Sequence, residues 1–112
     1  MNIELQEHIV RTWVIRLSGR LDAFSVGRLR EQQESLLEAG GKRFLVDLRG
    51  LEFLDSAGLA ALVSLLKRAR QLGGDVVLVA PTHEEARRIL TLTRFDQVFR
   101  QVENPESYLN SL

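Results

Sequence analysis

The sequence predicts an α/β domain with a mixed, mostly parallel β-sheet that is covered by about four α-helices. Two observations lead to this fold class. Segments with strand periodicity alternate with segments of helical periodicity in the order β-β-α-β-α-β-α-β-α, and this alternation is typical of parallel sheets. The chain has 112 residues, 45% hydrophobic and 27% charged, which suits one globular fold. We therefore interpret residues 1–112 as a single domain.

The first two strands are expected near the N-terminus. Ile3 and Leu5 alternate with polar residues, and the apolar residues of the next segment also repeat with a period of two at Trp13, Ile15 and Leu17. Residues 8–11 between them suit a hairpin connection, which would make the first strand antiparallel to the second.

A helix is expected to follow, with Ser25 as its N-cap and the pair at residues 40–41, both glycine, as its end. The inward face of this helix consists of apolar residues at helical spacing, namely Val26, Leu29, Leu36 and Leu37. Gly27 lies near the start, where the lack of a side chain would permit close approach of a partner.

The third strand is expected over residues 43–48. Phe44, Val46 and Leu48 share one face of it, and Leu45 and Asp47 share the other. The apolar pattern continues through a glycine to Asp55, and a helical pattern starts immediately afterwards.

The second helix, over residues 57–72, has the most regular pattern in the chain. Leu59, Leu62, Val63 and Leu66 follow the spacing of one buried helix face, and two glycines at 73–74 end the pattern.

The last elements follow in the same alternation. Residues 76–80 form an uninterrupted apolar strand, typical of a strand covered on both faces. Thr82 and Glu85 predict a capping box for a third helix. Residues 97–102 predict a short last strand. Asn104 and Pro105 are expected to open a terminal helix with three apolar or aromatic residues on one side, Tyr108, Leu109 and Leu112.

Composition and charge exclude several classes of protein. The 15 basic and 15 acidic residues balance, so bulk charge gives no support for nucleic-acid binding. There are no cysteines, which excludes disulfides, thiolate metal sites and a cysteine nucleophile. No apolar run reaches the roughly 20 residues that span a bilayer, and the N-terminus lacks the features of a signal peptide. We expect a soluble, cytoplasmic protein that does not bind membranes.

Asp55 and Ser56 stand where a strand's carboxyl end leads into a helix. Open α/β sheets place ligands at such positions, and the free N–H groups of the helix start favour an anion. Ser56 could equally be a simple N-cap, because serine and aspartate are preferred there. Both interpretations remain open from the position of the residue alone.

Catalysis by Ser56 has little support in the sequence. A nucleophilic serine needs a base within hydrogen-bonding reach, and the chain has only His8 and His83. Leu54 replaces the first glycine of a G-x-S-x-G elbow, and no glycine-rich phosphate-binding motif is present. If Asp22 and Asp55 meet at one end of the sheet, two carboxylates would surround the hydroxyl. Such a pair could hold Mg²⁺ for phosphoryl transfer, although turn and helix capping is the simpler role.

The sequence resembles the STAS domain family (sulphate transporter and anti-sigma factor antagonist), and most closely the stand-alone bacterial anti-sigma factor antagonists. The resemblance covers essentially the whole chain. The motifs are G-R-L-D at 19–22, V-D-L at 46–48, F-L-D-S-A-G-L at 53–59, G-G-D-V-V-L-V at 73–79 and I-L-T-L-T-R-F at 89–95.

This resemblance implies a STAS-type fold and a phosphorylation switch. The unphosphorylated protein would bind an anti-sigma factor that is itself a serine kinase, and so release a sigma factor. The kinase would then phosphorylate Ser56 and end the interaction, and a phosphatase would reverse the change. ATP and Mg²⁺ would belong to the kinase, so this chain would need no cofactor and would not be an enzyme.

The resemblance also implies roles for the residues around Ser56. Asp22 and Asp55 would flank the phosphoacceptor. Three residues of the motif, Ala57, Gly58 and Leu59, would form the helix start and the docking surface. The chain departs from the usual pattern at two positions, since Arg20 stands where an acid is common and Ala60 where glycine is frequent.

Two alternatives keep other functions open. The chain could be a STAS subunit of a lipid transporter or of another signalling assembly. It could also be a small enzyme or nucleotide-binding protein that uses Ser56 with Asp22 and Asp55.

Overall fold

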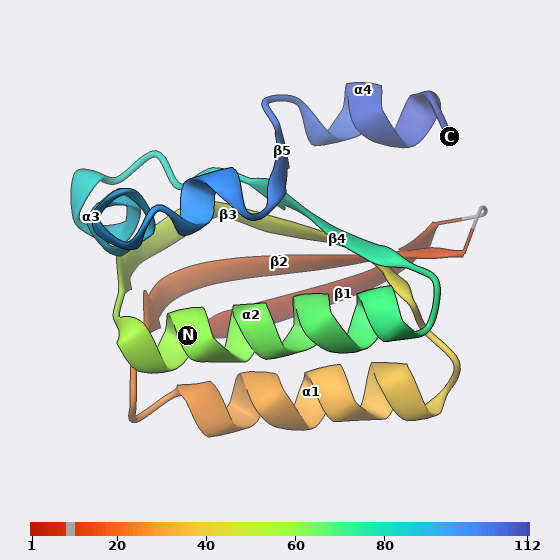
Figure 1. Ribbon diagram of the computed structural model, residues 1–112. Helices are drawn as coiled ribbons and strands as arrows, with labels where there is room; N and C mark the ends of the chain where they lie inside the picture. The colour runs from red at the N-terminus through yellow and green to blue at the C-terminus, as the bar shows by residue number, and fades with distance from the viewer. Residues whose placement is uncertain (9–10) are drawn as a thin grey trace.

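The computed structural model describes residues 1–8 and 11–112. Within these residues a five-stranded sheet in the order β1-β2-β3-β4-β5 forms the centre of the molecule (Figure 1). The strands are β1 (Asn2–His8), β2 (Thr12–Leu21), β3 (Arg43–Leu54), β4 (Asp75–Val79) and β5 (Arg100–Val102). β1 pairs antiparallel with β2, and all other neighbouring pairs are parallel. The predicted mixed sheet is confirmed, while the expected connection at residues 8–11 includes two residues outside those described.

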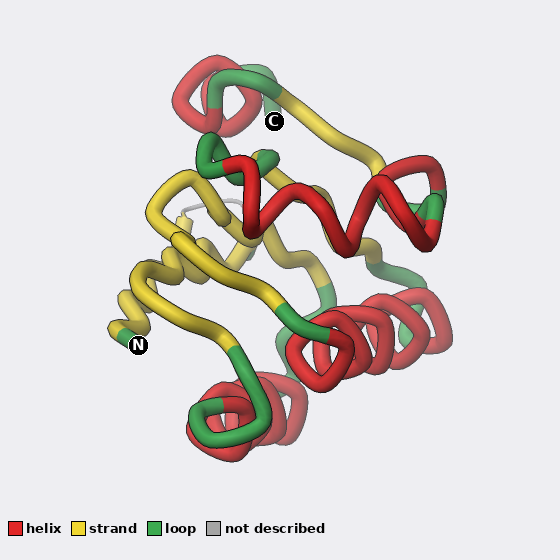
Figure 2. The backbone as a smooth tube through the Cα atoms, turned by 90° about the vertical axis from the view of Figure 1, so that its left-hand side faces the viewer, coloured by secondary structure: helices red, strands yellow, loops and turns green. Residues whose placement is uncertain are grey.

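The helices occur where the sequence pattern predicts them. They are α1 (Val26–Glu38), α2 (Ser56–Gln71), α3 (Glu84–Thr93) and α4 (Pro105–Asn110), with a short 3₁₀ helix, η1 (Phe95–Gln97), after α3. Figures 1 and 2 show α1 and α2 side by side against the sheet, and α4 apart from them. Side chains from α1, α2 and α3 share one apolar core with the sheet, whereas α4 contributes to a second cluster.

The two faces of β3 separate as predicted. Phe44, Val46 and Leu48 belong to the large core under α1, α2 and α3. Leu45 lies in the smaller cluster on the other face, where it packs with Val14, Val77, Val79 and Leu109. Burying both faces of the central strands explains why β3 and β4 read as nearly continuous apolar runs.

Of two predicted helix starts, the position of Ser25 is confirmed and the capping box at Thr82 is wrong. Ser25 occupies the N-cap position of α1, but its hydroxyl accepts from the Asp22 amide at 3.0 Å and donates to the Arg20 carbonyl at 2.9 Å. The predicted capping box is wrong, because His83 is the N-cap residue of α3 and Thr82 Oγ1 donates to the Arg49 carbonyl at 3.1 Å. A tertiary partner competes with the local cap at Thr82, whereas the Ser25 hydroxyl bonds to the turn just before the helix. The predicted start of α4 is confirmed.

The C-terminal region also differs in detail. The last strand covers only residues 100–102, because the chain turns through Arg94 in a left-handed conformation into η1 and then buries Phe99. Leu109 is buried and Tyr108 half-buried, as expected, but Leu112 lies beyond the end of α4 and is exposed.

Three further observations complete the fold. The buried face of α1 includes Gln33, which the apolar pattern did not predict. A Cβ atom placed on Gly27 would have no neighbour within 4 Å, so no close approach occurs there within the described chain. Among residues 1–8 and 11–112, no helix combines the length and the apolar character needed to cross a membrane.

Candidate functional site

The ends of β2 and β3 lie side by side. Leu21 and Leu54 are register partners in the parallel ladder, and the next residues are Asp22 and Asp55. The Asp55 amide extends the pairing by donating to the Leu21 carbonyl at 3.2 Å. The two loops therefore lie at one end of the sheet, which is the condition on which the hypothesis of paired carboxylates depended.

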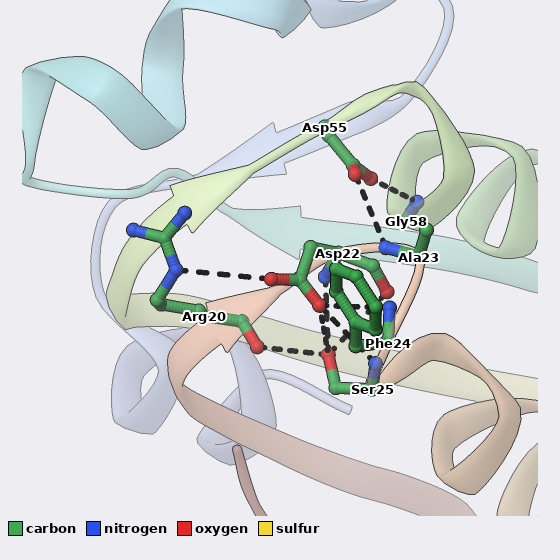
Figure 3. Close-up of polar contacts among 7 residues, drawn as sticks. All are labelled: Arg20, Asp22, Ala23, Phe24, Ser25, Asp55 and Gly58. Atoms are coloured by element: carbon green, nitrogen blue, oxygen red, sulfur yellow. Dashed lines mark hydrogen bonds and ion pairs between the residues drawn. The ribbon is translucent and has the colours of Figure 1, made fainter.

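The Asp55 carboxylate fixes the start of α2 and also the neighbouring loop. Oδ1 accepts from the Gly58 amide at 3.0 Å, which makes Asp55 the N-cap of α2. Oδ2 accepts from the Ala23 amide at 3.1 Å, across the gap between the two loops (Figure 3). The interpretation of Ser56 as the N-cap is wrong, because Asp55 takes that position and Ser56 becomes the first helical residue.

Ser56 presents a free hydroxyl. The residue is exposed, and its side chain makes no hydrogen bond with any residue in the described parts of the chain. The amides of Ser56 and Ala57 lie in the first turn of α2, where N–H groups have no carbonyl acceptor within the helix. A negative group on the Ser56 oxygen would face the positive end of the helix dipole.

Asp22 orders the loop between β2 and α1. Its Oδ1 accepts from the amides of Phe24 at 3.0 Å and Ser25 at 3.2 Å (Figure 3). The Arg20 guanidinium lies 3.7 Å from Oδ2 and also stacks over the Phe53 ring, 4.1 Å from its centroid. The two carboxylates therefore bind backbone amides and an arginine, and the described structure gives neither of them a hydrogen bond to the Ser56 hydroxyl.

Phe24 is the residue of this region that sequence reasoning missed. Its side chain is 99% exposed, although the backbone on both sides is held by Asp22 and Asp55. Single exposed apolar side chains are common on protein surfaces, and this one stands on a loop that Asp55 links to the start of α2. The signal in the sequence was a single phenylalanine within an otherwise small and polar turn.

The residues after Ser56 support the site from inside. Gly58 and Leu59 are buried, and Ala57 is half-buried. A Cβ atom on Gly58 would lie 2.7 Å from side-chain atoms of both Leu21 and Leu54, so glycine lets the helix start approach the strand ends. These residues shape the site mainly by positioning α2.

A groove of about 520 Å³ separates the Ser56 region from α3. One wall consists of β3 and the start of α2, and the other of one face of α3. The lining side chains on the α3 wall are Glu85, Arg88, Ile89 and Leu92. No histidine lines the groove within the described chain, so it offers no base of the kind that a serine nucleophile requires. No group of three or more acidic or histidine side chains that could hold a metal ion occurs among residues 1–8 and 11–112.

Residues 1–107 match the STAS domain family, and the chain belongs to that family. The resemblance inferred from the motifs is thereby confirmed. The family includes proteins whose names describe a role in transcription control, and several of them align with nearly the whole of this chain.

An anti-sigma F factor antagonist of Paenibacillus polymyxa is 25% identical, over 100% of this chain and 97% of the relative. An anti-sigma-B factor antagonist of Listeria monocytogenes is 24% identical, over 98% of this chain and 95% of the relative. A STAS-domain-containing protein of Pseudomonas aeruginosa is 32% identical over 77% of this chain and 83% of its own length.

Solved structures confirm the STAS fold. An anti-sigma factor antagonist from Mycobacterium paratuberculosis superposes with a TM-score of 0.79 at 22% identity, over 98% of this chain and 92% of the other. The antagonist SpoIIAA in its unphosphorylated form has a TM-score of 0.77 at 20% identity, over 98% and 96% of the two chains. The phosphorylated form, from Bacillus, has a TM-score of 0.76 at 20% identity, over 99% and 100%.

Proposed function

We propose that this protein is an anti-sigma factor antagonist, which binds an anti-sigma factor through the surface around Ser56 and is released when Ser56 is phosphorylated. Full-length relatives carry the name of this function. The observation that supports the switch is the exposed, unbonded Ser56 hydroxyl at the start of α2. In this function the protein is the substrate of a kinase, and a separate phosphatase would restore the hydroxyl.

The phosphorylation step uses a cofactor that the kinase would bring. The Ser56 oxygen would attack the γ-phosphorus of ATP and give its proton to a base of the kinase, while the bond from the γ-phosphorus to the bridging oxygen breaks and ADP leaves. The acceptor must therefore reach into another protein's active site. Its exposure allows this, and the Asp55 cap keeps the helix start in one position.

The phosphate would weaken binding by its charge. It adds about −1.5 to −2 charges at neutral pH. The helix start of this chain tolerates that charge, but a partner matched to the neutral hydroxyl would have to desolvate it on binding. Phe24 lies on the neighbouring loop and would supply the apolar part of the same contact.

A surface switch needs no change of fold. SpoIIAA matches this chain about equally well in its two forms, with TM-scores of 0.77 and 0.76. Both forms therefore share the STAS fold with this chain, as a switch that acts through surface charge requires.

The first experiment is to capture the partner. Ser56→Ala protein, which cannot be phosphorylated at that position, is used as bait in extracts of the source organism. An anti-sigma factor kinase among the captured proteins would support the proposal, whereas a transporter component would favour a transport assembly instead.

The second experiment tests the modified residue. The captured kinase is incubated with ATP and the wild-type, Ser56→Ala or Ser35→Ala protein, and phosphopeptides are identified by mass spectrometry. Ser35 is an exposed serine on α1 and serves as the control. Phosphate should appear on Ser56 in the wild type and in Ser35→Ala, and the modified protein should bind the kinase at least about tenfold more weakly. Equal phosphorylation of Ser56→Ala would contradict the assignment.

A further inference from the structure

We propose that Arg88, on α3, binds the phosphate that Ser56 carries and holds it across the groove. This inference rests on the proposed function and adds a residue to it. The sequence motif around Ser56 does not include Arg88, which lies 32 positions further along the chain.

The groove brings the two residues together. Ser56 and Asp55 line one wall, and Arg88 lines the other, within a space of about 520 Å³ (Figure 1 shows α3 beside the start of α2). Glu85, Arg88 and Leu92 recur at the spacing of one helix face, so α3 turns this face towards the groove. A flexible arginine side chain can move within such a space without any change in the backbone.

Arg88 is available for a new partner. Its side chain is exposed and makes no hydrogen bond or ion pair with any described residue. The other arginine near the site, Arg20, already contacts Asp22 and the Phe53 ring. Among the residues that line the groove, Arg88 is the only cation.

The charges in the groove favour this contact once the phosphate is present. The groove also contains the carboxylates of Asp55 and Glu85. Both oxygens of the Asp55 carboxylate accept backbone amides, which holds the carboxylate beside Ser56, where it would repel a phosphate dianion. The guanidinium group offers two parallel donors that match phosphate oxygens, and the first amides of α2 approach from the other side.

The test installs the phosphate without a kinase. Phosphoserine is incorporated at position 56 during synthesis, and its second ionisation is followed by ³¹P NMR during a pH titration. The variants are Arg88→Ala, Arg88→Lys and Arg87→Ala. Arg87 is the neighbouring exposed arginine, whose side chain has no hydrogen bond or ion pair among the described residues and does not line the groove, and it serves as the matched control.

Loss of the Arg88 contact should raise the second pKa of the phosphoserine by about 0.3 to 0.7 units, the size expected for an exposed ion pair. Arg87→Ala should leave the second pKa of the phosphoserine within about 0.1 unit of its value without the substitution. Arg88→Lys should give a pKa between those of the unsubstituted protein and Arg88→Ala, because lysine keeps the charge but lacks the planar guanidinium group. The difference should shrink in about 1 M salt, where the Debye length falls to about 3 Å. Equal titration curves for Arg88→Ala and Arg87→Ala, with circular dichroism showing both folded, would overturn the proposal.

The two proposals fail separately. An unchanged titration in Arg88→Ala would remove the Arg88 contact and leave phosphorylation by a kinase untouched. A kinase that modifies another residue would remove the switch, while the titration would still report whether Arg88 binds a phosphate at position 56.

Discussion

The carboxylate of Asp55 joins two loops through residues that are 32 positions apart in the sequence. One oxygen caps α2 and the other binds the amide of Ala23. Replacing an N-cap aspartate by alanine typically costs about 1 kcal/mol, and here the link between the loops would be lost as well. At the scale of single residues, the site is therefore a rigid frame that carries two free groups, the Ser56 hydroxyl and the Phe24 ring.

Because the Phe24 ring is exposed on a loop that Asp22 and Asp55 hold in place, we expect Phe24→Ala to weaken partner binding without destabilising the protein. A phenylalanine side chain has only two rotatable bonds and so loses little entropy on binding, and central aromatic contacts are often worth about 2 kcal/mol or more. We expect the Kd for the captured anti-sigma factor, measured by titration calorimetry, to rise about 10- to 100-fold. The urea unfolding free energy should change by less than about 0.5 kcal/mol, because the ring is 99% exposed in the folded state.

The control for this prediction is Leu72→Ala. Leu72 is 52% exposed and follows the last residue of α2. Its substitution therefore removes an exposed apolar side chain at the end of α2 that is far from Ser56. Equal affinities for Phe24→Ala and the wild type would show that the loop lies outside the interface.

At the scale of elements, the position of α2 depends on how closely its first turn approaches the ends of β2 and β3. Gly58 lies against Leu21 and Leu54, and Leu59, Leu62 and Leu66 bury the same helix in the core. This packing places Ser56 at the edge of the sheet. α1 has no comparable contact at Gly27.

This difference predicts opposite effects for the same substitution in two helices. Gly58→Ala places a Cβ atom 2.7 Å from two leucine side chains and 3.0 Å from the Leu21 carbonyl, so we expect a loss of about 1–3 kcal/mol of unfolding free energy. Gly27→Ala has open space and gains helix propensity, so it should stabilise the protein by up to about 1 kcal/mol. Urea denaturation of both variants checks the pair, and a Gly58→Ala protein as stable as the wild type would contradict the packing argument.

At the scale of the whole molecule, the two faces of the sheet differ in character. The face towards α1, α2 and α3 is a continuous apolar core, whereas the other face combines the smaller cluster near α4 with a buried acid, Asp47. Arg49 binds the Asp47 carboxylate through two side-chain contacts, of 3.0 Å from Nε and 2.8 Å from Nη2, and through its own amide at 3.1 Å. Burial raises the pKa of Asp47, but these hydrogen bonds, with the charges of Arg49 and Arg16, outweigh it and leave the pKa lowered.

The lowered pKa of Asp47 predicts a pH-dependent contribution to stability. Because the carboxylate is favoured in the folded state, its contribution is complete above the unfolded pKa of about 3.9 and is lost as pH falls through the lower folded pKa. We expect Asp47→Asn to be about 1–3 kcal/mol less stable than the wild type at pH 7. The difference should stay constant from about pH 8 to pH 5 and narrow only below about pH 4.

Chemical denaturation across this pH range measures the difference. Glu52→Gln is the control, since Glu52 is an exposed acid on the same strand with no hydrogen bond or ion pair among the described residues. A stability gap for Asp47→Asn that grows as pH falls would contradict the sign of the pKa shift.

Elements that follow from the periodicity of apolar residues could be predicted from the sequence. Contacts in which a distant residue competes with a local hydrogen-bond partner could not. The apolar alternation in β3 and the helical spacing in α2 are properties of neighbouring residues, so both were predictable. The caps were harder. Thr82 has the right neighbours for a capping box, but the Arg49 carbonyl lies within its reach only after β3 and β4 have paired. Phe24 was missed for a related reason, because a local pattern cannot tell which apolar side chain the fold leaves uncovered.

The sequence by itself determined the order of the elements, the mixed sheet and the STAS family, because periodicity, turn residues and motifs are local properties. The resemblance to the family also implied that Asp22 and Asp55 would flank Ser56. Only the tertiary structure decided what each of these acids binds, that the Ser56 hydroxyl is free and that Arg88 faces it across a groove. Those features depend on atoms that are distant in the chain and that only the packed strands and helices bring together.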